Sequence, residues 1–301
     1  MKCNLCPRNC NVERYSSFGV CGTHGAVLSR VAKHNWEEPC ISGTKGSGTV
    51  FFAGCNLKCR FCQNYDITVQ PHGVEVSPKR LADVFLYVQE MGVANINLVT
   101  PSHVLPTVAE ALALAKPKLR IPVVYNTSSY EKVSALKMLE NLVDVFLPDL
   151  KFCSSEVAQS MCGAPNYFEV ATAAIAEMKR QQPQNVLDSE GYLQNGLIIR
   201  HLVLPGFVED SKLILDWISH FDKNATVSLM SQYFPARQDK KYPQLNRRLF
   251  KHEYDNVRDY FFNVGLKNGY MQQLSSATAD YLPEFDDSGV QSVLNSAPHV
   301  F

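Results

Sequence analysis

From Thr49 to about residue 235 the chain alternates short apolar runs with longer stretches of helical periodicity. A short run rich in Val, Ile, Leu and Phe is typical of a buried strand, and a longer amphipathic stretch is typical of a helix. The apolar runs are 49–53, 94–99, 121–125, 143–148, 197–204 and 226–230, and the helical stretches are 78–91, 103–115, 131–141, 166–181 and 209–221. This order predicts an α/β fold in which a parallel sheet curves into a partial (β/α)6 barrel, an incomplete TIM barrel open at one side.

Three cysteines follow the first of these strands on one short loop. Gly54 ends the strand, and Cys55, Cys59 and Cys62 follow in a Cys-x3-Cys-x2-Cys pattern. Thiolates are the ligands that iron–sulfur clusters and zinc prefer, and a short loop loses little entropy when it closes around one centre. Closed structural sites usually use four ligands, so three leave a place for an outside ligand. A zinc knuckle, or three thiols that are only packed, remains the alternative.

The same loop resembles the signature loop of the radical S-adenosylmethionine (SAM) enzymes, with Phe61 directly before its last cysteine. The resemblance implies that Cys55, Cys59 and Cys62 hold a [4Fe–4S] cluster, that SAM binds its open iron, and that Phe61 lies against the adenine. It also implies reductive cleavage of SAM to methionine and a 5′-deoxyadenosyl radical, which abstracts hydrogen from a substrate. The family fold is a partial (β/α)6 barrel, in agreement with the alternation above.

Later strand ends carry further candidates, because the active site of such a barrel lies at the carboxyl ends of its strands. Asn126 follows the third strand in a segment that resembles the Thr-Asn-Gly segment of glycyl-radical activases. Asp149 and Lys151 follow the fourth strand and point the same way. They resemble the Asp-x-Lys motif of pyruvate formate-lyase activating enzyme, and a salt bridge closing the barrel top is the alternative. Arg200 interrupts the apolar fifth strand and resembles an activase arginine near the SAM carboxylate.

Two strand ends depart from the family pattern or allow two interpretations. After the second strand, Thr100-Pro101-Ser102-His103 stands where the family often has Gly-Gly-Glu, which receives the amino group of SAM. Thr100 and Ser102 offer oxygens instead, and we expect a structural role for the isolated His103. After the sixth strand, Gln232 and Tyr233 either contact SAM or substrate, or Tyr233 seals the barrel.

A second set of cysteines lies near the N-terminus, in a segment with few apolar residues. Such a segment stays disordered unless something such as a metal ties it down. The set predicts a second metal site, which either holds zinc or an auxiliary iron–sulfur cluster. The alternative is a cap whose thiols are only packed, or paired on oxidation. The candidate ligands are Cys3, Cys6, Cys10 and Cys21, with His24 and Cys40 as substitutes.

These features divide the chain into three expected parts. Residues 1–48 form a Cys-rich N-terminal cap, residues 49–235 the radical SAM core, and residues 236–301 a C-terminal helix and tail that cover the barrel. We expect the helix over 242–264, at the open side, and an edge strand over 270–274. We expect residues 275–301 to be poorly ordered or draped over the surface.

Composition limits the function classes. The chain has 301 residues, and its 29 Lys and Arg equal its 29 Asp and Glu, so nothing favours binding to nucleic acid or to an anionic membrane. No apolar stretch reaches transmembrane length, and the start has no signal peptide. Ten cysteines without such a signal favour the reducing cytoplasm.

The sequence therefore predicts a radical SAM oxidoreductase that resembles pyruvate formate-lyase activating enzyme. The resemblance implies a glycyl-radical enzyme or another protein as substrate, and a low-potential electron donor such as flavodoxin or ferredoxin. The alternatives are a radical SAM enzyme that acts on a small molecule, since the variable rim decides the substrate, and a non-catalytic zinc-binding scaffold.

Overall fold

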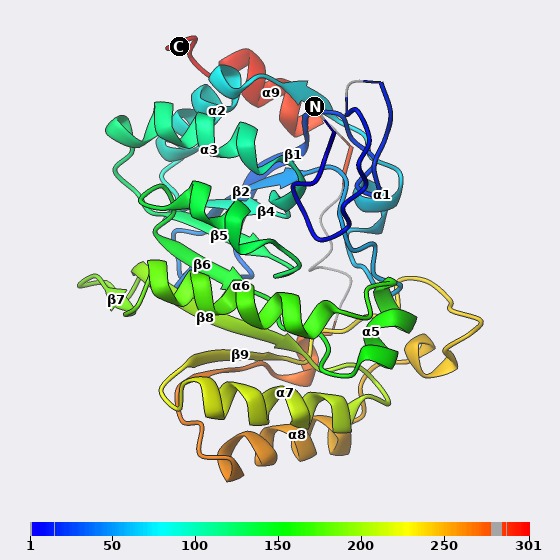
Figure 1. Cartoon of the computed structure of the whole chain (residues 1–301). Coiled ribbons are helices and arrows are strands. Elements are labelled where there is room, and N and C mark those ends of the chain that lie inside the picture. The colour runs from blue at the N-terminus through cyan, green and yellow to red at the C-terminus, as the bar shows by residue number, and fades with distance from the viewer. Residues whose placement is uncertain (1, 15, 278–284, 287) are drawn as a thin grey trace.

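The computed structural model describes residues 2–14, 16–277, 285–286 and 288–301 (Figure 1). Six parallel strands run side by side in the order of the sequence. Each is joined to the next by at least one helix, which is the arrangement of a partial barrel. The predicted α/β fold is thus confirmed. The strands are β2 (Ser47–Phe52), β4 (Ile96–Val99), β5 (Val123–Thr127), β6 (Val145–Pro148), β8 (Leu193–Leu202) and β9 (Thr226–Met230).

Helices cover the outer face of this sheet (Figure 1). They bury their apolar stripes against the strands, as the helical periodicity requires. At the start of the first, the Ser77 side chain accepts a hydrogen bond from the Arg80 N–H (3.2 Å) and Pro78 occupies the first helical position. The helices are α2 (Pro78–Glu90), α3 (Leu105–Ala115), α4 (Val133–Leu136), α6 (Tyr167–Gln181) and α7 (Val208–Phe221), with α1 (Tyr65–Val69) and α5 (Ser155–Cys162) between strands and helices at the carboxyl edge.

Four further strands extend the sheet. β1 (Ala26–His34) lies antiparallel to β2, and β3 (Val74–Val76) pairs with β1. β10 (Gly269–Met271) pairs parallel to β9, close to the expected edge strand, and β7 (Val186–Leu187) pairs with β8. Because β1 belongs to the sheet, the sheet begins well before residue 49.

The connection between β1 and β2, residues 35–46, packs on the inner face of the sheet. Cys40 and Ile41 form one buried cluster with inward side chains of the barrel strands, among them Leu147 and Ile198. The Cys40 carbonyl accepts the Leu193 N–H (2.8 Å). This connection therefore fills the amino-terminal part of the barrel interior and leaves space only toward the carboxyl ends of the strands.

The C-terminal part differs from its prediction. α8 (Lys251–Asn263) packs beside α7 in the outer layer (Figure 1). α9 (Ser288–Ser296) packs on β1 and α2 through the buried Val290 and Val293, and Arg80 donates to the Ala297 carbonyl (3.2 Å). Poor order, one of the two expected states of the tail, is therefore wrong for 288–296, because the spacing of these two valines forms an apolar stripe. Residues 278–284 and 287 of that tail lie outside the described residues.

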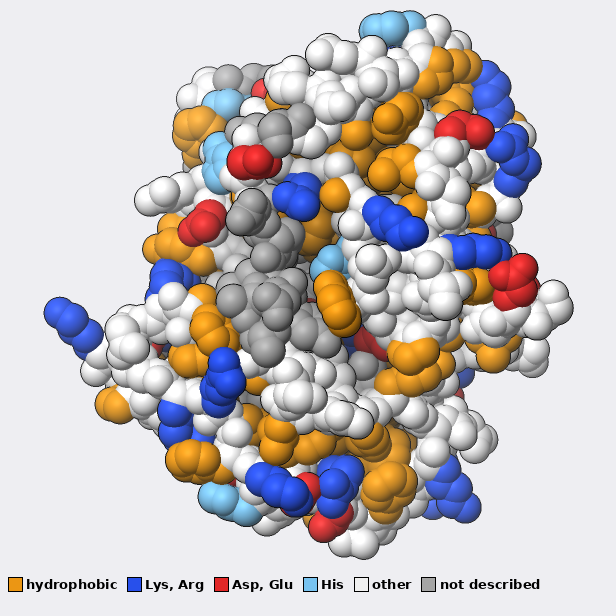
Figure 2. Space-filling model, turned by 180° about the vertical axis from the view of Figure 1, so that it is seen from behind, with side chains coloured by type: hydrophobic (Ala, Val, Ile, Leu, Met, Phe, Trp, Pro, Cys, Tyr) orange, Lys and Arg blue, Asp and Glu red, His pale blue; other side chains and the backbone are white. Residues whose placement is uncertain are grey.

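Basic and acidic side chains are interspersed on the face shown in Figure 2, in keeping with their equal numbers in the sequence. In the described part of the chain, every helix is too short or too polar to cross a membrane.

Candidate functional site

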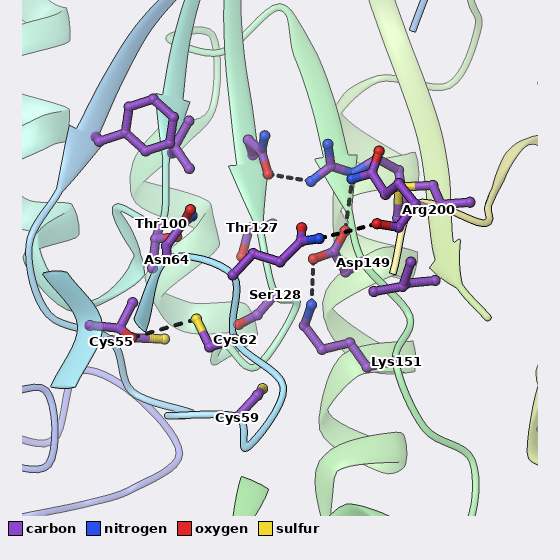
Figure 3. Close-up of a pocket in the computed structure, with 18 of the residues that line it drawn as sticks. Cys55, Cys59, Cys62, Asn64, Thr100, Thr127, Ser128, Asp149, Lys151 and Arg200 are labelled. Carbon is purple, nitrogen blue, oxygen red and sulfur yellow. Dashed lines mark hydrogen bonds and ion pairs between the residues drawn. The ribbon is translucent and has the colours of Figure 1, made fainter. Parts of the chain in front are cut away.

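A cavity of about 210 Å³ lies at the carboxyl edge of the parallel strands (Figure 3). The loop after β2 contributes three cysteines and an aromatic ring, and the ends of β5, β6 and β8 contribute polar side chains. The structure thus brings together all eight residues that the sequence predicts for the cluster and SAM. They are Cys55, Cys59, Phe61, Cys62, Asn126, Asp149, Lys151 and Arg200.

The three thiols are held inside this cavity. Cys55 and Cys59 are each 8% exposed, and the Leu57 N–H donates to the Cys55 Sγ (3.4 Å). Burial raises the pKa of Cys55, and it raises the pKa of Cys62 to about 12. Without a metal these thiols keep their protons at neutral pH, and a metal that binds displaces these protons.

The donor set fits a cluster better than a single ion. No three His, Cys, Asp or Glu side chains in the described ranges lie close enough together to hold one metal ion. In a cubane cluster each cysteine binds a different iron, so its ligands stay further apart than the ligands of one zinc ion. Three soft thiolates around a cavity with room beyond them therefore fit a [4Fe–4S] cluster with one open iron.

The backbone of the cysteine loop is fixed at its start. Gly54 has φ +85°, and a Cβ at this position would lie 2.6 Å from the Cys21 carbonyl oxygen, so only glycine fits. The Asn56 Nδ2 donates to the Tyr130 carbonyl (2.8 Å), and Arg8 Nε donates to the Asn56 carbonyl (2.7 Å). These contacts orient the loop toward the cavity.

Opposite the thiols, charged side chains from the ends of β6 and β8 form a connected network with a glutamate and an asparagine (Figure 3). Asp149 accepts from Lys151 Nζ (2.6 Å) and from Arg200 Nε (3.0 Å). Arg200 also donates to Glu37 Oε2 (3.2 Å) and to Asn126 Oδ1. Burial raises the pKa of Asp149, but the two cations outweigh it and hold this pKa below its usual value. The carboxylate therefore stays ionised between two fixed positive charges.

A buried tyrosine supports this network from behind. The Tyr167 hydroxyl receives the Lys151 N–H (3.0 Å) and lies 2.8 Å from the Asp149 carbonyl, to which it donates. Its ring packs edge to face on Phe152, which in turn packs edge to face on Phe61 (5.7 Å between centroids). One side chain thus positions both the charged pair and the aromatic ring of the cysteine loop.

Of the two hydroxyl side chains proposed after β4, Thr100 and Ser102, one lines the cavity and the other does not. Thr100 lines the cavity, with its backbone at φ +61°, whereas Ser102 is buried and donates to Glu131 Oε1 (3.0 Å). His103 is also buried, and its Nε2 lies 2.8 Å from the Ala53 carbonyl. Burial lowers the pKa of His103 to about 4, so this imidazole is neutral. Thr100 is therefore the candidate that remains for this side of the cavity.

The two candidates that follow β9 also differ in whether they line the cavity. Gln232 lines the cavity, whereas the buried Tyr233 donates its hydroxyl hydrogen to the Leu245 carbonyl (2.6 Å). Tyr233 therefore seals the barrel wall, which was one of its two expected roles.

Glu37, in the connection after β1, also belongs to the site, although the sequence did not predict it as a site residue. It accepts from Asn97 Nδ2 of β4 (2.9 Å) as well as from Arg200. Burial raises the pKa of Glu37, and Arg200 opposes this shift. No sequence pattern distinguishes this glutamate, because its position depends on how the connection packs inside the barrel.

A second cavity of about 380 Å³ adjoins the first. The two share Trp36, Glu37, Arg200, Met230 and Gln232 on their walls. The second cavity extends from there along β9 and β10. The site therefore has space for a second molecule next to the cysteine loop.

The four N-terminal cysteines line a small separate cavity together with His103. The two substitute ligands lie elsewhere: His24 stacks on Phe18 (3.9 Å between centroids), and Cys40 belongs to the cluster on the inner face of the sheet.

Comparison with known proteins gives the family. Residues 49–217 match the model of the radical SAM superfamily. A protein of Methanocaldococcus jannaschii, named uncharacterized protein MJ0674, is 34% identical over 267 residues, which cover 85% of this chain and 72% of that protein.

Two solved structures illustrate the likeness at lower similarity. SuiB of Streptococcus suis, bound to S-adenosylmethionine, is 16% identical with a TM-score of 0.49, over 77% of this chain and 51% of SuiB. Methylornithine synthase (PylB) is 14% identical with a TM-score of 0.49, over 81% of this chain and 79% of that one. The match to the family model spans more than half of the sequence. The chain belongs to the radical SAM superfamily.

Proposed function

We propose that this radical SAM enzyme modifies a protein, as glycyl-radical activating enzymes do. Cys55, Cys59 and Cys62 are the residues that would hold the [4Fe–4S] cluster. When bound, the cluster and SAM supply reductive cleavage of SAM and abstraction of a hydrogen atom from the substrate. The supporting observation is that the cysteine cavity shares wall residues with the second, larger cavity, where a substrate group would lie next to SAM.

The charged network suits the polar groups of SAM. Lys151 and Arg200 present two cations to its carboxylate, and the ionised Asp149 between them suits its amino group. Phe61 lies at the cavity wall, where its ring offers a flat surface for the adenine. Each of these side chains is fixed before SAM binds, so little conformational entropy is lost on binding.

A protein substrate would insert one residue into the second cavity. Its volume of about 380 Å³ is in the range of ligand pockets, which is enough for a single side chain and its backbone. The proposal includes a low-potential donor of one electron, of the flavodoxin or ferredoxin type. It also places the protein in the cytoplasm, where ten cysteines stay reduced. A small-molecule substrate is the second candidate, since the same volume admits one.

The test begins with anaerobic reconstitution, followed by dithionite and SAM, and chromatography for 5′-deoxyadenosine. We expect the product from the native chain and none from Cys59→Ala, because two thiolates do not hold a cluster with an open iron. Cys153→Ala is the matched control, since this half-buried cysteine is not among the residues lining the cavity. Product from Cys59→Ala at the native rate would contradict the assignment.

The substrate class needs a second measurement. A cell extract is separated by ultrafiltration into macromolecules and small molecules, and each fraction is added to the reduced enzyme with SAM. Stimulation of 5′-deoxyadenosine formation by the macromolecular fraction, lost after protease treatment, supports a protein substrate. Stimulation only by the small-molecule fraction supports the second candidate.

A further inference from the structure

We propose that Cys3, Cys6, Cys10 and Cys21 bind a second metal centre, directly behind the loop that carries Cys55. The ligand chemistry is four thiolates around an iron–sulfur cluster, because no three of the candidate side chains in the described ranges lie close enough together to share one metal ion. The inference goes beyond the proposed function, because neither SAM cleavage nor the choice of substrate requires it.

The first observation is convergence. The four cysteines are spread over nineteen positions of the sequence, yet all four line one cavity. The remaining walls of this cavity come mainly from apolar side chains such as Leu5 and Val12. Four thiols gathered in one enclosed space are an unusual use of cysteine in a surface segment, and thiolates in such a group are metal ligands.

The second observation is that hydrogen-bond donors around this cavity point at the sulfur atoms. The Val20 N–H donates to the Cys10 Sγ (3.4 Å), and Arg14 Nη2 lies 4.0 Å from the Cys21 Sγ. A Cβ at Gly19 would lie 3.2 Å from the Cys10 Sγ, so the chain passes close to this sulfur. N–H groups and an arginine directed at sulfur are the kind of contact made to the ligands of a bound metal.

The third observation is an unpartnered nitrogen on the same cavity wall. His103 Nε2 lies 2.8 Å from the Ala53 carbonyl, so Nε2 carries the proton and Nδ1 has a free lone pair. Nδ1 is buried and has no hydrogen-bond partner in the part of the chain that is described. A neutral imidazole with a free buried lone pair is a fifth possible ligand beside the four thiols.

The fourth observation is that this segment cannot be stabilised by its own core. Between residues 2 and 25, the described positions form no helix and no strand, only the isolated bridge between Lys2 and Glu13. Phe18 is 61% exposed and Val20 is 39% exposed. A segment with so little apolar burial gains its order from other bonds, and metal–ligand bonds supply many kilocalories per mole.

The position of this cavity links it to the SAM site. The Cys21 carbonyl accepts the Cys55 N–H (3.3 Å), and Figure 1 shows the N-terminal segment at the same edge of the sheet as the cysteine loop. Arg8, between Cys6 and Cys10 in sequence, donates to the carbonyls of Asn56 (2.7 Å) and Cys162 (2.7 Å). A metal that fixes the N-terminal segment therefore also positions the loop that holds the first cluster.

The first test removes the SAM cluster and asks whether metal remains. We measure iron, zinc and sulfide per chain in the full-length variant Cys55→Ala, Cys59→Ala, Cys62→Ala, purified without oxygen. We expect about four irons with sulfide per chain. A variant that is metal-free, or that holds zinc alone, overturns the proposal, while SAM cleavage by the native chain would still stand.

The second test assigns the ligands and keeps the loss of metal separate from loss of folding. In the same background, Cys10→Ser should lose the metal, whereas Cys10→His, which retains a ligand, should recover at least half of it. Cys153→Ser is the control and should retain all of it. Equal metal content in Cys10→Ser and in the control overturns the assignment. The assignment is also overturned if Cys10→His folds with native circular dichroism but does not recover the metal.

The third test addresses positioning. These variants are now made in the chain that retains Cys55, Cys59 and Cys62. Cys10→His should keep the first cluster. Cys10→Ser should lose the first cluster to an iron chelator at least about tenfold faster than Cys153→Ser does, as expected when a group that supports metal ligands is removed. The readout is the rate of bleaching, which does not depend on turnover. Equal rates would show that the two centres are independent and would overturn the positioning role.

Discussion

Replacing Asp149 by Asn should destabilise the protein by removing the only carboxylate that contacts both Lys151 and Arg200 among the described residues. The three side chains are 16%, 18% and 11% exposed, so water screens them poorly. Removal of one partner from a buried ion pair costs 3–5 kcal/mol, and the residual exposure together with Glu37 favours the lower end, about 3 kcal/mol.

The assay is equilibrium urea unfolding at 25 °C, with the free energy of unfolding compared between variants. Asp255→Asn is the matched control, because Asp255 also lies between two cations, Lys251 and Arg258, but on an exposed helix surface. Since solvent screens exposed pairs, the control should lose much less stability.

The pH dependence gives a second check on the same variant. The folded-state pKa of Asp149 lies below its usual value, so its contribution is present above the unfolded pKa and is lost as pH falls through the folded pKa. The stability gap between the native chain and Asp149→Asn should therefore be constant above about pH 5 and shrink below about pH 4. A gap no larger than that of the control at pH 7, or one unchanged at pH 3, would refute the reasoning.

Three further perturbations test other contacts. Tyr167→Phe should cost about 1–3 kcal/mol in urea unfolding, since it leaves buried backbone groups of Asp149 and its neighbours unpaired; a change below the error of the fit would contradict this. Gly54→Ala should lower the melting temperature and the iron retained per chain, because its Cβ would lie 2.6 Å from the Cys21 carbonyl oxygen; native iron content would count against it. Glu253→Gln should lose about 1 kcal/mol at pH 7, since hydrogen bonds from its arginine partner lower the pKa of Glu253 to about 2. This gap should close as pH falls from about 4.5 toward 2, and a gap independent of pH would exclude the carboxylate as its source.

Local patterns were sufficient to predict the barrel and several residues that line its cavity. Each of the six parallel strands is a short apolar run between turn signals, and the active edge of such a sheet follows from its topology. The cysteine loop and Asp149 directly follow strands, and Asn126 and Arg200 lie near the carboxyl ends of β5 and β8, so their meeting in one cavity required no knowledge of long-range packing.

Features that depend on long-range packing could not be read from the chain. Glu37 reaches Arg200 across 163 positions, and no periodic pattern marks the connection that carries it. The second β4 candidate, Ser102, turns away from the cavity because Glu131 offers it a buried partner. α9 was missed because its short apolar stripe is flanked by polar and small residues, and its partners on β1 and α2 lie far earlier in the sequence.

The connection between β1 and β2 has a consequence for the diversity of such enzymes. It supplies Trp36, Glu37 and Glu38 to the second cavity, but both of its ends are held in the sheet by the pairing of β1 with β2. The cavity-facing side chains near its start can therefore differ between related chains, while Cys40 and Ile41 keep their packing against the strands. Substitutions at Trp36 and Glu38 would thus change one wall of the second cavity, which makes the start of this connection a position at which the proposed specificity could be altered.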